Sequence, residues 1–169
     1  MDCLPSALPS GLLRECISLH GVQIPPTVAE IGPDLFRGCA ALEQVELPDS
    51  VTRLGARAFL DCEELAGVSL GNGLKRIGAR AFARCPALAE MEIPPSLRFL
   101  GFGAFGLGYS KERMVLTVKT EYLEKRLRRL VFWAGSAGRV EIRFSGKTID
   151  QRKRERRRAT VEQTATHIS

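Results

Sequence analysis

Apolar residues return at the same positions every 23 residues along most of this chain. The step is kept without an insertion over about 90 residues. A fixed period of roughly 20–50 residues is the sequence signature of a solenoid, in which each repeat forms one turn and packs on its neighbours. The clearest positions that keep the step are Phe36, Phe59, Phe82 and Phe105; Cys16, Cys39, Cys62 and Cys85; Leu19, Leu42, Leu65 and Leu88; Val22, Val45, Val68 and Met91; and Gly32, Gly55, Gly78 and Gly101.

Each repeat contains one half-buried strand, a break and a return toward the core. Val45 and Leu47 are two residues apart, so an extended strand places both on its buried face. Pro48 ends that strand, because it has no N–H to donate to a ladder. Gly55 permits a close backbone approach that a Cβ would block. The spacing from Ala58 to Cys62 predicts a short helical or 3-10 turn.

One repeat cannot bury its apolar face alone, whereas stacked repeats share a continuous core. Neighbouring strands lie about 4.8 Å apart. Burying about six or seven apolar side chains stabilises each turn by on the order of 10 kcal/mol before the entropy cost is subtracted. That cost is of similar size, so several turns are needed, and about four and a half are present.

The stretch from Leu42 to Cys62 reads L-x-x-V-x-L-P-x-S-V-x-x-L-G-x-x-A-F-x-x-C and resembles the BspA-like class of leucine-rich repeats. The resemblance covers about residues 13–106. It implies an α/β repeat solenoid that is right-handed and curved, with a parallel β-sheet on the concave side and short helical or 3-10 turns. It also implies a protein-binding or surface-adhesion role without general catalytic activity.

The resemblance further implies a C-terminal cap at residues 107–145 that covers the open end of the core. We expect a strand at Val115–Val118, a helix from Tyr122 to Phe132, then Trp133, and a last strand with Val140, Ile142 and Phe144. At the other end, Met1 to Gly11 act as a cap, or the chain is a fragment of a longer array. Residues 1–145 therefore form one solenoid domain.

The net charge of +6 is unevenly distributed. Residues 1–110 carry 9 Lys+Arg and 12 Asp+Glu, whereas residues 111–169 carry 16 and 7. Residues 146–169 form a basic tail that we expect to be disordered when free. Its densest run consists of Arg152, Lys153, Arg154, Arg156, Arg157 and Arg158. Three interpretations of such a run are open. It is a solvated tail without a partner; it is a nuclear localisation signal or binds nucleic acid non-specifically; or it contacts a membrane surface or a protein.

The polar residues between the buried strand positions form the candidate binding site. By register they face outward from the concave sheet in two columns, which makes a small and mildly acidic surface. One interpretation is a binding face for a protein segment, such as a basic one, and the other is a solvated sheet face without a ligand. The candidate residues are Gln23, Gln44, Glu46, Ser69, Glu90 and Glu92, with Gly21 and Gly67 between them.

Catalysis and metal binding find little support in the sequence. The cysteines recur every 23 residues without a C-x-x-C pair, so we interpret them as buried, reduced core residues rather than metal ligands or disulfides. The two histidines, His20 and His167, match no catalytic motif. We therefore expect neither an enzyme nor a cofactor.

The N-terminal sequence lacks a positive charge before its apolar residues, and no run of 18 or more apolar residues exists. These features predict neither a secretory signal nor a transmembrane segment, and they favour the cytosol or nucleus. The favoured function is a protein–protein interaction scaffold. The alternatives are a nucleic-acid-associated protein that uses its tail, and a fragment of an extracellular surface or adhesion protein.

The nucleic-acid alternative predicts that the full chain binds unstructured RNA with a steep salt dependence. With the six cations of the 152–158 run, the slope of log K against log [salt] is expected to be about −4 for single strands. Filter binding with and without residues 146–169 tests this. Binding that survives removal of the tail, or that does not respond to salt, contradicts a nucleic-acid role of the tail.

Overall fold

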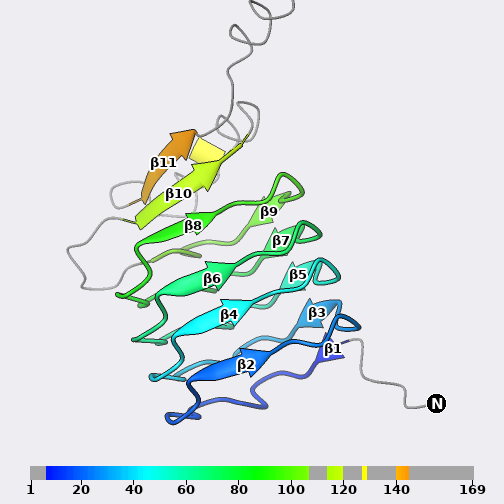
Figure 1. Ribbon diagram of the computed structural model, residues 1–169, viewed down its shortest axis with the longest axis vertical. Coiled ribbons are helices and arrows are strands. Elements are labelled where there is room, and N and C mark those ends of the chain that lie inside the picture. Colours follow the sequence, from blue (N-terminus) through cyan, green and yellow to red (C-terminus); the bar gives the residue numbers. More distant parts are fainter. Residues whose placement is uncertain (1–6, 107–113, 120–126, 129–139, 145–169) are drawn as a thin grey trace, which may run out of the picture.

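The computed structural model describes residues 7–106, 114–119, 127–128 and 140–144. They form a solenoid of parallel strands, in which each turn adds one short strand to a front stack and one to a rear stack (Figure 1). The front stack contains β2 (Gly21–Gln23), β4 (Gln44–Glu46), β6 (Gly67–Ser69), β8 (Glu90–Glu92), β10 (Met114–Val118) and β11 (Val140–Phe144). The rear stack contains β1 (Ala7–Leu8), β3 (Glu30–Ile31), β5 (Arg53–Leu54), β7 (Arg76–Ile77) and β9 (Phe99–Leu100).

The rear stack is one five-stranded sheet, whereas the front stack is divided into β2-β4-β6 and β8-β10-β11. Strands β6 and β8 are neighbours without a ladder between them. This turn has glycine at positions 67, 71 and 73. Val68 is only half-buried, while Val45 and Met91 at the same position of the adjacent turns are buried.

The core is a set of columns of identical or similar side chains along the solenoid axis. The rings of Phe36, Phe59, Phe82 and Phe105 are stacked, with centroids 5.0, 5.3 and 5.9 Å apart and planes within 10° of parallel. All four rings are buried. These separations are close to the distance between neighbouring strands, so each ring meets the equivalent ring of the next turn.

The repeated glycine is required by the close approach of successive turns. A Cβ added to Gly55 would lie 2.4 Å from the backbone nitrogen of Pro33, and one on Gly78 would lie 2.5 Å from that of Ala56. Real Cβ atoms do not approach backbone so closely, and neither glycine has a positive φ. The close approach predicted for this position is therefore present.

The helical or 3-10 turn expected at Ala58–Cys62 is not found. The chain forms turns there, with Arg57 just before the segment (φ 56°) and Asp61 within it (φ 64°) in the left-handed region. The backbone N–H of Phe59 donates to the carbonyl of Ala81 in the next turn at 2.8 Å. A helix would use such N–H groups for its own carbonyls. Hydrogen bonding between turns thus replaces the α component of the expected α/β repeat.

Past the regular repeats, β10 and β11 lie where the sequence predicts strands. Strand β10 pairs in parallel with both β8 and β11, so it covers the edge of β8. Of the predicted helix, the structure describes Leu127 and Arg128, which are helical, and Leu127 is buried. The rest of that helix, Trp133 and the basic tail lie outside the described residues.

Replacing Phe59 with Ala is expected to lower the free energy of unfolding by about 3–5 kcal/mol, because it leaves a cavity in the middle of the ring stack. Urea unfolding followed by circular dichroism measures the change. The control is Phe102→Ala, which removes an exposed ring and is expected to cost less than about 0.5 kcal/mol. Equal effects of the two substitutions would contradict the importance of the stack.

Candidate binding surface

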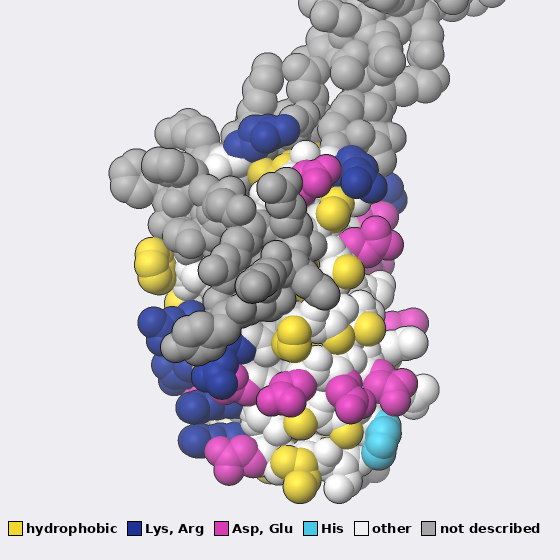
Figure 2. Space-filling view, turned by 90° about the vertical axis from the view of Figure 1, so that its left-hand side faces the viewer, with side chains coloured by type: hydrophobic (Ala, Val, Ile, Leu, Met, Phe, Trp, Pro, Cys, Tyr) yellow, Lys and Arg dark blue, Asp and Glu magenta, His cyan; other side chains and the backbone are white. Residues whose placement is uncertain are grey.

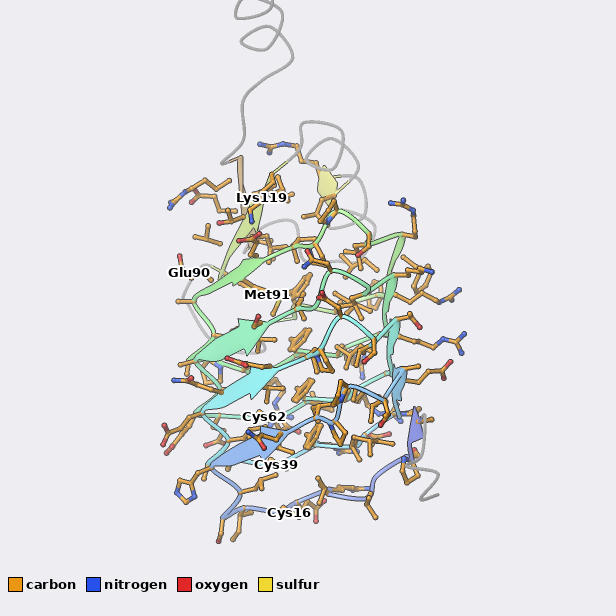
Figure 3. The ribbon with its side chains drawn as sticks, turned by 45° about the vertical axis from the view of Figure 1, so that its right-hand side comes forward. Cys16, Cys39, Cys62, Glu90, Met91 and Lys119 are labelled. Carbon is orange, nitrogen blue, oxygen red and sulfur yellow. The ribbon has the colours of Figure 1, made fainter. Side chains whose placement is uncertain are left out.

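The six candidate residues all lie on the outer side of the front strands. Parallel register aligns Gln23 with Glu46 and Glu46 with Ser69, while Gln44 aligns with Gly67. Glu90 and Glu92 flank Met91 on β8, and Glu90 points outward whereas Met91 points into the core (Figure 3). The two columns of outward side chains expected from the sequence are therefore present. Both are interrupted between β6 and β8, where the front stack divides into two sheets.

Two shallow hollows on the front face include all six candidate residues. The first lies over β2 and β4, and its wall contains Gln23, Gln44, Glu46 and Ser69. Its remaining lining is largely apolar and includes Val22, Pro25 and Pro48. The second hollow lies at the division between β6 and β8, and its lining includes Val68, Glu90, Glu92 and Thr117.

Sequence reasoning missed the continuation of this surface onto the last two strands. Val115 aligns with Glu90 and Thr117 with Glu92, and the columns then reach Glu141 and Arg143. Lys119 forms an ion pair with Glu92 at 2.5 Å. The 23-residue register could not be extended to these residues, because residues 106–114 break the period between Phe105 and β10.

Charges are segregated between the two sides of the repeat body. All nine Lys and Arg residues of segment 7–106 lie on the rear strands, beside them, or in the turns that follow, and none lies on a front strand. Seven of its eleven acidic residues lie on the front strands or their flanking loops. They are Glu43, Glu46, Asp49, Glu63, Glu64, Glu90 and Glu92. In Figure 2, Lys and Arg gather along one edge of the lower body, away from most Asp and Glu.

Most of the front carboxylates have no partner among the described residues. Glu92 pairs with Lys119, and Asp49 accepts hydrogen bonds from the backbone and side chain of Asn72. The other five, which are exposed and form no ion pair or hydrogen bond with described residues, are Glu43, Glu46, Glu63, Glu64 and Glu90. We call the six candidate residues together with Glu43, Glu63 and Glu64 the acidic face.

The rear carboxylates, in contrast, are each paired with an arginine. Asp34 lies 2.8 Å from Arg57 of the next turn and 3.7 Å from Arg37. The hydrogen bond from Arg57 holds the pKa of Asp34 below its usual value, against the opposing effect of burial. The other three pairs are Arg14–Glu15, Arg53–Glu30 and Arg84–Asp61. Within segment 7–106, carboxylates without a partner among the described residues therefore lie on the front side.

The cysteines form a structural column inside the solenoid. Cys16, Cys39 and Cys62 lie one above another (Figure 3), and Cys39, Cys62 and Cys85 are buried. Each buried thiol donates to a carbonyl of the preceding turn, such as Cys62 to Phe36 at 3.1 Å. Burial raises the pKa of Cys39 and Cys62, and it raises that of Cys85 to about 12.

The described residues contain no group of three or more potential metal ligands. His20 is exposed, and its Nδ1 lies 2.9 Å from the carbonyl oxygen of Ser18. His167 lies outside the described residues. Within the same part of the chain, no helix is both long and apolar enough to cross a membrane.

A solenoid of parallel strands with a 23-residue step and a repeated apolar pattern has the architecture of leucine-rich-repeat proteins. The family model for the BspA type leucine-rich-repeat region matches residues 6–125 in six copies. The chain belongs to this family. Among curated proteins, none matches the sequence.

Two solved structures resemble the chain at 27% sequence identity. A leucine-rich-repeat protein of T. pallidum has a TM-score of 0.66, with 88% of this chain and 68% of that chain covered. A leucine-rich cell surface protein of Faecalibacterium prausnitzii has a TM-score of 0.57, with 79% of this chain and 34% of that chain covered. The chain thus spans about a third of the second relative's length.

The folded protein is expected to react with the thiol reagent DTNB at pH 8 at no more than two of its five cysteines. These are the half-buried Cys16 and Cys3, which lies outside the described residues. The buried thiols stay protonated well above pH 8 and are inaccessible. All five should react in urea. Rapid reaction of a third thiol in the folded protein would show that the reagent reaches the cysteine column, and would contradict its burial.

Proposed function

We propose that this chain is a non-enzymatic binding scaffold whose acidic face holds a basic segment of a partner protein. The observation that carries the proposal is the set of five exposed carboxylates without a partner among the described residues, on the side of the solenoid that lacks Lys and Arg in the regular repeats. Clustered like charges repel one another, so an opposite charge that binds there relieves that repulsion.

The first hollow suits the side chains of such a segment. Lys and Arg combine an apolar stem with a charged end, and they bury the stem against apolar surface while the end reaches a polar group. Val22, Pro25 and Pro48 supply the apolar surface, and Glu46 and Gln44 supply acceptors beside it. Family membership supports this type of role, because repeat surfaces of this kind commonly serve protein interaction or adhesion.

The setting we propose is the cell surface. One similar structure is that of a cell surface protein, which favours the extracellular alternative over the cytosol or nucleus. Neither the family match nor the similar structures support a cytosolic or nuclear location, or a nucleic-acid partner. The alternative function based on Arg152–Arg158 concerns residues outside the described part of the chain, and it stays a prediction from the sequence.

The double substitution Glu46→Lys with Glu90→Lys is expected to weaken binding of a basic peptide at least about tenfold, because it replaces attraction by repulsion at both hollows. Fluorescence anisotropy with a labelled peptide of alternating lysine and threonine measures the affinity. The thermal melt followed by circular dichroism should stay unchanged, because both side chains are exposed.

The matched control is Glu15→Lys with Glu30→Lys, which changes the net charge equally at two rear positions. It should leave the affinity within about threefold, because solvent and salt screen charges on the far side. Equal losses in the two double variants would show that the peptide senses only net charge. That outcome would refute the acidic face as the site.

A further inference from the structure

Strands β7 and β9 lie in the rear stack, away from the front strands that carry the acidic face (Figure 1), and a second exposed surface lies over them. It consists of Lys75, Arg76, Arg80, Phe99 and Phe102, all of which are exposed. We call it the basic–aromatic surface. We infer that it is a docking site for an acidic polypeptide segment that also carries apolar side chains.

The two phenylalanines of this surface have no role in the core. Phe99 and Phe102 are 44% and 64% exposed, while the stacked phenylalanines are buried. The position of Phe99 is occupied by Arg76 in the preceding turn, and that of Phe102 by Ala79. Neither position therefore needs a large apolar residue for the repeat to fold. Neighbouring exposed aromatic rings, in contrast, are a common feature of interaction sites.

Among the described residues, the cations of this surface are not paired with carboxylates, unlike those of the turns below. Lys75 and Arg80 form no ion pair with described residues, and the Arg76 guanidinium lies 4.6 Å from the centroid of the Phe99 ring. Within segment 7–106, every rear carboxylate belongs to an earlier turn and is paired with an arginine. The positive charge of the rear side is thus least compensated where the aromatic rings are exposed.

The backbone holds the two kinds of side chain close together. Residues Arg76 and Phe99 are register partners on β7 and β9. The backbone N–H of Arg80 donates to the carbonyl of Phe102 at 3.1 Å. Because both contacts belong to the ladder between turns, the surface is arranged before a partner arrives, which lowers the entropy cost of binding.

A polypeptide fits this surface better than a nucleic acid does. Arginine and aromatic residues together are enriched at the centres of protein interfaces. Single-stranded nucleic acid would need open ring faces for base stacking, but Arg76 already occupies one face of Phe99. Three cations also neutralise few phosphates, which gives weak backbone binding at physiological salt.

This inference does not depend on the acidic face, because the two surfaces lie on opposite sides of the solenoid. The test uses the full chain and two labelled peptides. In the first, glutamate alternates with leucine and phenylalanine, and in the second, serine replaces the apolar residues. The first peptide should bind at least about tenfold more tightly than the second, because it also buries apolar surface against the rings.

Two double variants separate the contributions of charge and of the rings. Arg76→Glu with Arg80→Glu should weaken binding of the first peptide at least about tenfold. The matched control, Arg14→Glu with Arg37→Glu on lower turns, should change the affinity for that peptide less than about threefold. Phe99→Ser with Phe102→Ser should remove the preference for the first peptide without changing any charge. Because the basic tail is present in every variant, it cannot account for differences between them.

The inference fails if both peptides bind equally, or if neither the arginine nor the phenylalanine variant changes the affinity for the first peptide. It also fails if an unstructured RNA binds more tightly than the first peptide and loses that binding in the Arg76→Glu, Arg80→Glu variant. The surface would then be a site for polyanions. Thermal melts of the variants verify that each one is folded.

Discussion

The contact between successive turns determines almost everything else in this molecule. Rings 5.0–5.9 Å apart, ladder hydrogen bonds and a glycine without room for a Cβ all enforce the same separation. A residue inserted into any turn would shift every column at once, which explains why the 23-residue step is kept so strictly. The reduced cysteines also join successive turns, since each buried thiol donates a hydrogen bond to a backbone carbonyl of the preceding turn.

The strict packing of the inward positions leaves the outward ones free to carry function. On the front strands these positions carry carboxylates and amides, and on the rear strands and turns they carry arginines. Side chains at the same repeat position lie side by side, so a few substitutions in consecutive repeats create a patch of one charge. The acidic face and the basic–aromatic surface both arise in this way, from columns that do not contribute to the core.

The period was enough to predict the parallel solenoid and the outward direction of Gln23, Gln44, Glu46, Ser69, Glu90 and Glu92, because alternation along a strand fixes which side chains point out. Other features depend on contacts between turns. The spacing of Ala58, Phe59 and Cys62 fits a helix, but the backbone N–H of Phe59 bonds to the next turn. The division between β6 and β8 has no counterpart in the 23-residue period, and the rear surface depends on Arg76 and Phe99 being register partners.

Mapping the contact residue by residue is the most direct test of whether the outward columns of the solenoid bind the partner. Backbone amide chemical shifts of the full chain would be followed during titration with the lysine–threonine peptide. If these columns bind the peptide, the largest changes cluster at β2, β4 and β8, with amides of the rear strands nearly unmoved. Changes concentrated on the rear strands, or on residues 146–169, would contradict binding by the outward columns.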